Sequence, residues 1–372
     1  VLMKFNRLVL FVLLALMAGV LSACGGAVST AWPGVTVEGD VAYLADGLYV
    51  YQVDLNTGAE ITRTVNGETK PVRFPETSNN QVNFFAPPVL TPDGQLIVGS
   101  AGHSHNLYSI NPQTFAVNWV FEKARDVYLG SALVLGDRIY APNGDSNLYV
   151  LDLKGNLLTT FDMPEHGLWS APITDGQTIY LTALDHHVYA LEPSTLAVKW
   201  KTKLDGAINA SPALSADGVL YVGTLSKTLF ALDAATGSIV WQRPLAGWLY
   251  SSPSLDGDTL YIGAVVGATD GKVYAIDAVN GAQRWEYTTG SAVAGKILVL
   301  DGSVAFTTEN GTLGVLKKDG ALDWKETYEH NFYAGPLLWN DTLLAAPSQS
   351  QTLLVAINPA NRSIKWKFPQ EK

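Results

Sequence analysis

The sequence is poor in cysteine and in charged residues, and these shortages exclude several classes of protein. Its 372 residues contain one Cys, 24 Lys and Arg and 34 Asp and Glu, which gives a formal net charge of −10. A single Cys excludes a disulfide framework, a Cys-rich zinc site and a Cys-ligated iron–sulfur cluster. The acidic balance argues against a nucleic-acid partner, because binding to phosphates requires clustered Lys and Arg.

Glycine and aromatic residues are abundant instead. The chain has 34 Gly, 10 Trp and 16 Tyr, while charged residues make up only 16%, well below the usual quarter. This balance is typical of an all-β protein with many turns. The length corresponds to two or three ordinary domains, or to one large repetitive domain.

The single Cys lies at the end of an N-terminal apolar segment. Lys4 and Arg7 precede an apolar run over 8–23, which at about 16 residues is shorter than the ~20 that a membrane-spanning helix needs. The run ends in Leu-Ser-Ala-Cys-Gly, with the Cys at position 24, which resembles a bacterial lipobox. We therefore predict a lipoprotein signal peptide over 1–23, a lipidated Cys24 with a short linker over 24–30, and one domain over 31–372. The alternative is an uncleaved anchor that happens to contain a cysteine.

An internal repeat is the strongest signal in the remaining chain. Residues 229–241 and 273–285 share an apolar segment, an Asp, a Gly four residues later and a final Trp. The Asp position recurs about every 41 residues after one longer first interval of 57, as Asp54, Asn111, Asp152, Glu192, Asp233, Asp277, Lys317 and Asn358. Alternating apolar residues between turn signals indicate four antiparallel strands in each copy. The sequence therefore predicts an all-β fold, an eight-bladed β-propeller of four-stranded antiparallel blades.

Two details of the repeat lead to structural expectations. Three copies, at 111–115, 192–196 and 358–362, replace the Gly and gain a Pro after the polar residue, which predicts a different turn geometry there. A Trp recurs on the last strand of most copies, and its repetition favours packing between blades over a ligand site. These tryptophans are Trp119, Trp200, Trp241, Trp285, Trp324 and Trp366.

Eight copies at this period, with the motif Ala-x-Asp-x-x-Thr-Gly-x-x-x-Trp at 231–241, resemble the repeats of pyrroloquinoline-quinone-dependent dehydrogenases and their non-catalytic relatives. The resemblance extends over about 31–368 and implies PQQ-type blades. The dehydrogenases hold pyrroloquinoline quinone with calcium over the axis, and often place two adjacent cysteines against it. This chain has no second Cys, so we expect no catalytic residues, no cofactor and no metal.

A lipobox followed by eight such repeats is similar to the lipoproteins of the outer-membrane β-barrel assembly complex of Gram-negative bacteria. That resemblance implies a non-enzymatic scaffold that binds envelope proteins. The alternatives are a quinoprotein-like oxidoreductase that binds pyrroloquinoline quinone with calcium, and a propeller that binds a glycan or another small ligand.

In this family, the connections between blades share a face with the loops between the second and third strands. All six histidines map to that face, as do aromatic residues that precede the first strands, and we take both sets as a candidate interaction face. The set comprises Phe84, Phe85, His103, His105, Tyr128, His166, Trp169, His186, His187, Trp248, Tyr250, His330, Phe332 and Tyr333. The simpler interpretation is that polar loops tolerate His and that the aromatics plug the channel mouth. An insertion between the first two blades adds Arg63, Lys70 and Arg73, which we expect to form a small basic patch on the same face.

The leading hypothesis is a monomeric, lipid-anchored, extracytoplasmic scaffold in envelope protein assembly, with no nucleic-acid partner. The lipid on Cys24 would attach it to the outer membrane, facing the periplasm, in a Gram-negative cell. In any other cell it would attach the chain to the outer face of the cytoplasmic membrane.

Overall fold

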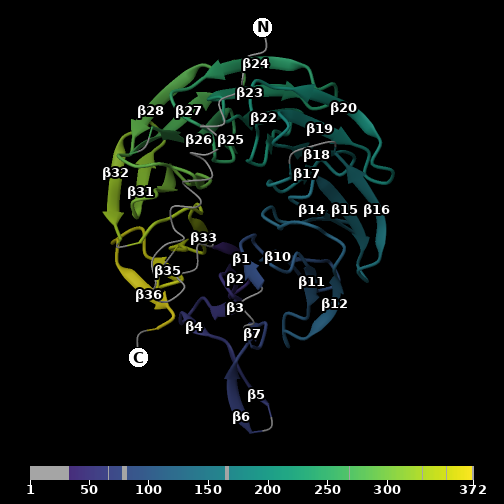
Figure 1. Cartoon of the computed structure of the whole chain (residues 1–372). Coiled ribbons are helices and arrows are strands. Elements are labelled where there is room, and N and C mark those ends of the chain that lie inside the picture. The colour runs from purple at the N-terminus through teal and green to yellow at the C-terminus, as the bar shows by residue number, and fades with distance from the viewer. Residues whose placement is uncertain are drawn as a thin grey trace.

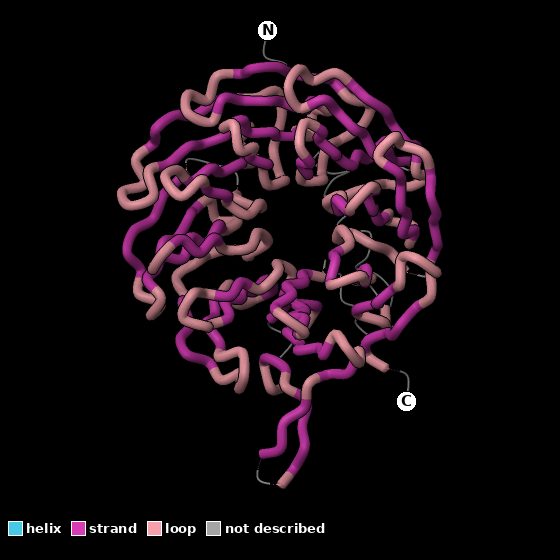
Figure 2. The backbone as a smooth tube through the Cα atoms, turned by 180° about the vertical axis from the view of Figure 1, so that it is seen from behind, coloured by secondary structure: helices cyan, strands magenta, loops and turns pink. Residues whose placement is uncertain are grey.

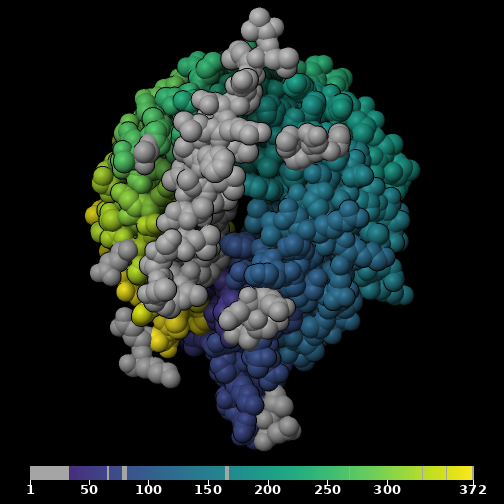
Figure 3. All heavy atoms as spheres, in the orientation of Figure 1, coloured from purple at the N-terminus to yellow at the C-terminus, as the bar shows by residue number. Residues whose placement is uncertain are grey.

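The structure, a computed structural model, describes residues 33–65, 67–77, 82–163, 167–267, 269–328, 330–348 and 350–370. The predicted signal peptide, Cys24 and the linker lie outside the described residues. All regular elements of the described part are strands, and it contains no helix that is long and apolar enough to cross a membrane. Eight antiparallel sheets follow one another around a ring (Figures 1 and 2), and the space-filling view shows an opening near its centre, which we call the channel (Figure 3). The prediction of an eight-bladed β-propeller is confirmed.

The first four blades occupy the first half of the chain. Blade 1 contains β1 (Gly34–Glu38), β2 (Val41–Asp46), β3 (Tyr49–Asp54) and β4 (Ala59–Glu60), with β7 (Arg73–Phe74) added on β3. Blade 2 contains β9 (Val89–Leu90), β10 (Leu96–Gly102), β11 (Leu107–Ile110) and β12 (Val117–Phe121), with β8 (Val82–Phe84) added on β10. Blade 3 contains β13 (Leu133–Leu135), β14 (Arg138–Pro142), β15 (Asn147–Asp152) and β16 (Leu157–Asp162). Blade 4 contains β17 (Ile173–Thr174), β18 (Ile179–Thr182), β19 (His187–Leu191) and β20 (Val198–Lys203).

The second four blades have four strands each. Blade 5 contains β21 (Ala213–Leu214), β22 (Val219–Gly223), β23 (Thr228–Asp233) and β24 (Ile239–Pro244). Blade 6 contains β25 (Ser254–Asp256), β26 (Thr259–Val266), β27 (Asp270–Asp277) and β28 (Gln283–Thr288). Blade 7 contains β29 (Leu298–Leu300), β30 (Ser303–Thr307), β31 (Thr312–Lys317) and β32 (Leu322–Thr327). Blade 8 contains β33 (Leu337–Trp339), β34 (Thr342–Ala345), β35 (Leu354–Ile357) and β36 (Ile364–Phe368).

The core of the protein lies between the blades. The second and third strands of each blade are almost continuously buried, as in β23, where the first five of six residues are inaccessible. Both faces of such a strand contact a neighbouring blade, so it does not need the polar alternation of a strand with one wet face. The fourth strands are mostly exposed, and in β24 exposed and half-buried residues alternate because one face of the strand is in contact with solvent.

The repeated Trp of the fourth strand joins one blade to the next. The Trp241 indole donates from Nε1 to the Ala278 carbonyl at 3.0 Å. A Cβ added to Gly281 would lie 2.7 Å from the Trp241 ring, so the turn of the next blade needs Gly there. Equivalent hydrogen bonds join Trp119 to Leu153, Trp200 to Ala234, Trp285 to Lys318 and Trp366 to Leu55. Each of these tryptophans therefore packs against the third-to-fourth-strand turn of the following blade.

The three turns that lack this Gly keep the same backbone path. In blade 5 the Gly237 amide donates to the Asp233 carbonyl at 2.8 Å, with φ at 73°. Phe115, Leu196 and Arg362 make the same hydrogen bond with φ of 53°, 60° and 65°. The prediction of a different turn geometry is therefore wrong. A residue with a Cβ in this left-handed region costs about 1–2 kcal/mol, so another contact must offset that cost.

In two of these turns, packing against the preceding blade supplies the compensation. Blade 3 has Thr159 opposite Val150, where blades 2 and 4–8 have their Trp. The Leu196 side chain of blade 4 is buried in the cluster that contains Val150. In the same way, Phe115 of blade 2 is buried against Tyr43 of blade 1, whose outer strand has only two residues. A large turn residue thus fills the space that a Trp fills elsewhere.

The ring closes between blades 8 and 1 by side-chain packing rather than by strand exchange. Each described blade is one continuous segment, so these two blades share no sheet, although they lie side by side (yellow and purple in Figures 1 and 3). Trp366 donates to the Leu55 carbonyl at 2.9 Å, and its ring covers Gly58. The Tyr51 and Phe368 rings meet edge to face at 5.5 Å, within a hydrophobic cluster shared by the two blades.

A hairpin in the insertion projects from the rim of the ring (Figures 1–3). It consists of β5 (Thr62–Val65) and β6 (Glu68–Pro71), which pair only with each other. All four residues of β6 are exposed. Arg63 lies opposite Lys70 in the register, and Lys70 forms an ion pair with Glu68 at 2.9 Å.

Arg73, at the base of the hairpin, does not belong to an exposed basic patch, so that expectation is wrong for this residue. Its Nε and Nη2 donate to the two Glu60 carboxylate oxygens at 2.9 and 2.6 Å. Its guanidinium carbon lies 5.2 and 5.4 Å from the ring centres of Tyr49 and Tyr51. A paired and stacked guanidinium of this kind has little freedom to bind a partner, so Arg73 anchors the hairpin.

Candidate interaction face

The inter-blade connections and the second-to-third-strand loops form one face of the ring, which we call the connection face. The described residues of the connections fall within 61–88, 122–132, 163–172, 204–212, 245–253, 289–297 and 328–336. Each connection contacts the loop of the blade that it enters or leaves. The Val127 carbonyl accepts from the Gly144 amide at 3.0 Å, and the Ala292 carbonyl accepts from the Glu309 amide at 3.0 Å. The described residues of the candidate set all lie in or beside these segments.

Three of the candidate aromatics are core residues rather than surface anchors. Phe84, Tyr128 and Phe332 are 0%, 1% and 0% exposed. Phe84 packs against Phe74 with ring centres 5.8 Å apart, and Tyr128 covers Gly99, where a Cβ would lie 2.4 Å from the Tyr128 Cβ. The prediction that these three side chains contact a partner is wrong. The apolar residues that fix a connection and those that bind a partner look alike in sequence.

Trp248 is the aromatic of the set that the structure leaves most accessible among the described residues, at 39%. Its amide donates to the Val265 carbonyl at 2.9 Å, and its carbonyl accepts from the Val265 amide at 3.0 Å. The Lys227 ammonium lies 5.6 Å from the centre of the Trp248 ring. Leu249 is fully buried beside it. Trp248 is therefore an exposed ring on a hydrogen-bonded backbone with a cation beside it, which is the arrangement of an interface anchor. The half-buried members of the set are Phe85, Trp169, Tyr250 and Tyr333.

The histidines do not converge. His103 is exposed, while His105, His186, His187 and His330 are half-buried, and His166 lies outside the described residues. Within the described ranges, no three His, Cys, Asp or Glu side chains are grouped so that they could hold a metal ion.

Asp185 explains the position of His187. One Asp185 carboxylate oxygen lies 3.2 Å from His187 Nδ1 and accepts from the Tyr189 hydroxyl at 2.5 Å. Blade 3 repeats the arrangement, because Asp145 accepts from the Tyr149 hydroxyl at 2.6 Å. These pairs stiffen the loops that carry the connection face. In the sequence, these pairs correspond to the motif Asp-x-x-x-Tyr, which occurs in two successive copies of the repeat.

Asp46 is a buried carboxylate at the end of β2, beneath the connection face. It is 7% exposed, and burial raises its pKa to about 7. At the corresponding strand end, four other blades have the neutral polar residues Ser100, Asn143, Thr224 and Thr308. Blade 1 therefore contains an acid where the repeat usually places a hydroxyl or an amide. An alignment of the eight copies with one another would identify Asp46 as an exception from the sequence.

A family model described as outer membrane protein assembly factor BamB matches residues 184–371, which is half of the chain. The chain belongs to the BamB family. The matched half contains Trp248 and Lys227, and therefore the most exposed aromatic anchor of the connection face. No curated protein sequence matches the chain.

Solved propellers share the fold at low sequence identity. BamB from Moraxella catarrhalis is 18% identical, with a TM-score of 0.69 over 85% of this chain and 93% of that one. The computationally designed Ika8 protein is 16% identical, with a TM-score of 0.69 over 90% and 98% of the two chains. A quinohemoprotein alcohol dehydrogenase from Comamonas testosteroni is 12% identical, with a TM-score of 0.71 over 86% and 71%. Likeness at these identities shows the fold alone, and BamB-family membership rests on the family model.

Proposed function

We propose that this BamB-family propeller is a non-enzymatic scaffold that binds a protein of the outer-membrane assembly machinery through its connection face. The exposed Trp248, on a backbone paired with Val265, is the observation that carries the proposal, because an aromatic ring at a fixed backbone position can bury a large apolar area in an interface. Family membership supplies the class of partner, since the family model is described by its role in outer-membrane protein assembly.

The surroundings of Trp248 support a protein partner. Lys227, beside the ring, can pair with an acidic group at the edge of the contact, where a charge adds specificity more than affinity. Neighbouring Leu245 and Leu249 are buried, so replacing Trp248 changes the surface and leaves the supporting core in place.

An affinity measurement with the periplasmic part of the barrel assembly complex tests the proposal. Trp248→Ala should weaken binding by at least about thirtyfold, which is the effect of a hot-spot residue worth ~2 kcal/mol. Val279 is 74% exposed on a third-to-fourth-strand turn, so Val279→Ala is the matched control and should leave binding unchanged. Equal affinities for both variants and the parent protein would remove Trp248 from the interface.

We further propose that Cys24 carries the lipid that holds the scaffold at the membrane, facing the periplasm. The lipobox-like segment that ends at Cys24 supports this proposal. A single acyl chain gives only marginal membrane binding, whereas two or more give a stable anchor. The short linker after the lipidated Cys24 would hold the propeller near the membrane, so that membrane-bound partners could reach its connection face.

A further inference from the structure

Lys296 is an exception within a collar of small and uncharged residues around the channel. In blades 2 to 8, the residue two positions before the first strand occupies the same place at the channel mouth. These residues are Pro87, Ser131, Ala171, Ser211, Ser252, Lys296 and Gly335. Blade 1 contributes Gly34, which packs against the backbone of Pro87. Lys296 is the one charged member of this described collar.

Neighbouring collar residues contact one another through their backbones. The Ser131 hydroxyl donates to the Pro87 carbonyl at 3.0 Å, and the Ser211 amide donates to the Ser252 hydroxyl at 3.1 Å. A Cβ on Gly335 would lie 2.0 Å from the Lys296 carbonyl. The Lys296 backbone therefore packs closely against Gly335, while the Lys296 side chain is exposed.

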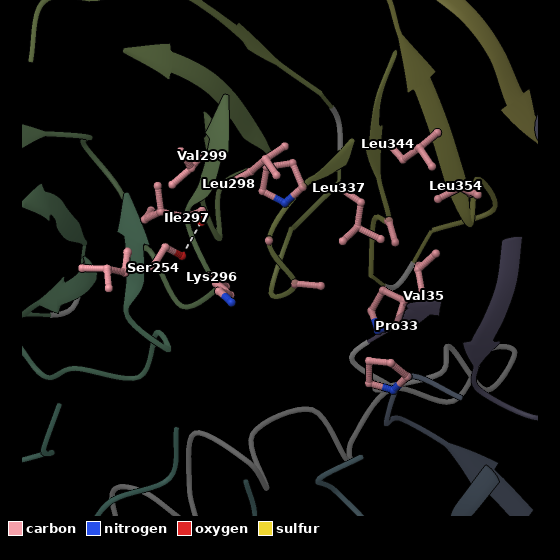
Figure 4. Close-up of a pocket in the computed structure, with 16 residues that line it drawn as sticks. Pro33, Val35, Ser254, Lys296, Ile297, Leu298, Val299, Leu337, Leu344 and Leu354 are labelled. Atoms are coloured by element: carbon pink, nitrogen blue, oxygen red, sulfur yellow. Dashed lines mark hydrogen bonds between the residues drawn. The ribbon is translucent and has the colours of Figure 1, made fainter. Parts of the chain in front are cut away.

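A cavity of about 440 Å³ lies beside Lys296 in the channel wall (Figure 4). Blades 7, 8 and 1 supply its apolar lining, including Leu298, Leu337, Leu354 and Val35. The hydroxyl of a further lining residue, Ser254, is already used, since it donates to the Ile297 carbonyl at 2.6 Å. The volume falls within the range of small-molecule sites, which combine apolar walls with a few placed polar groups.

The Lys296 ammonium has no hydrogen-bond or ion-pair partner among the described residues, and it is the one charged group that lines this cavity. A ligand that fits both features has an apolar chain, which leaves water on entering the cavity, and one anionic head group. A carboxylate head group would form a charge-assisted hydrogen bond with the ammonium.

We infer that this channel-wall cavity binds a long-chain carboxylate, with its chain against the apolar wall and its head group on Lys296. The inference does not depend on the proposed scaffold function, because Trp248 and Lys227, which carry that proposal, do not line the cavity. It assigns a small-ligand site to a propeller whose other candidate surface fits a protein.

Calorimetric titration with laurate, below its micelle concentration, tests the inference. All samples use the full chain with Cys24→Ser, so that no attached acyl chain competes. Laurate should bind saturably with one site per chain, and Lys296→Ser should weaken binding about tenfold, because it removes one charge-assisted contact. Lys296→Ser introduces the residue that the collar has in blades 3, 5 and 6, so the fold should tolerate it.

Two controls separate the charge from the apolar chain. Methyl laurate lacks the anion, so it should bind the parent protein and Lys296→Ser equally. Lys227→Ser removes a lysine from the connection face and should leave laurate affinity unchanged. An absence of saturable laurate binding, or equal laurate affinity with and without Lys296, would overturn the inference.

A photoreactive laurate analogue locates the ligand independently of affinity. The analogue should label the segments around Lys296 and Leu337 in the parent protein. Labelling confined to the segment around Trp248 or to the rim hairpin would contradict the proposed position.

Discussion

Replacement of Trp366 tests how the ring is closed. Trp366→Ala removes a half-buried indole between blades 8 and 1 together with its hydrogen bond to the Leu55 carbonyl. Truncation of a fully buried Trp costs about 3–5 kcal/mol and one hydrogen bond contributes about 1 kcal/mol. Because Trp366 is only half-buried, we expect the free energy needed to separate blades 8 and 1 to fall by about 3 kcal/mol in total. That loss corresponds to roughly hundredfold faster hydrogen exchange of the backbone amides that become exposed when blades 8 and 1 separate.

Native-state hydrogen exchange gives the position of the effect as well as its size. Trp285→Ala is the matched control, since Trp285 is also half-buried and donates to the Lys318 carbonyl at 2.8 Å. Blades 6 and 7 remain joined by the connection between them, whereas blades 8 and 1 are joined by packing and by hydrogen bonds such as those of Trp366 and Trp339. Trp366→Ala should therefore lower protection across β1–β3 and β33–β35. Trp285→Ala should cause a smaller loss in blades 6 and 7.

Two results would refute this reasoning. Retained protection in blades 1 and 8 of Trp366→Ala would mean that other contacts close the ring. Equal local losses for the two variants would mean that the covalent connection between blades 6 and 7 adds nothing to their docking.

Trp366→Phe keeps an aromatic ring but removes the indole donor, so it should cost only about 1 kcal/mol.

Three further predictions concern pH, the insertion and the membrane. The pKa of Asp46 is raised to about 7 in the folded protein from ~3.9 in the unfolded chain, so the folded state binds more protons between these values. Stability should fall as the pH rises from about 4 to 7, and Asp46→Asn should remove up to roughly 4 kcal/mol of that decline, as measured by urea unfolding at several pH values. An unchanged pH profile in Asp46→Asn would show that another group is responsible. Arg73→Ala breaks the Glu60 ion pair and the stacking on Tyr49 and Tyr51, so limited proteolysis should cut the rim hairpin several times faster, whereas resistance equal to the parent would mean that the β7 pairing alone anchors it. Cys24→Ser should move the protein from the membrane to the soluble fraction on cell fractionation, and persistent membrane attachment would favour an uncleaved apolar anchor.

The repeat made the architecture predictable because each copy has the same strands, the same turn position and the same Trp. The turn geometry at 111–115 and 192–196 was not predictable from one copy alone. At two of the three turns, a non-Gly residue in the left-handed region is tolerated because of the residue in the preceding blade. Phe115 and Leu196 are stable there because blades 1 and 3 lack the Trp that would occupy the same space.

The candidate face was harder to predict than the fold. The chain order of strands and connections was enough to map Trp248, Phe84 and Phe332 to the same side of the ring. Burial depends on contacts between segments that are distant in the sequence, so Phe84 and Phe332 could not be distinguished from Trp248. Lys227 beside Trp248 was missed for the same reason, since 21 residues separate them in the chain.

Site-specific crosslinking in cells tests the scaffold function most directly. A photoreactive amino acid is placed at position 248, and at position 279 as the control, in the full chain with an intact Cys24. We predict a crosslink from position 248 to the periplasmic part of the barrel assembly complex and none from position 279. A lack of crosslink at position 248, or equal crosslinks from both positions, would contradict a scaffold that binds its partner through the connection face.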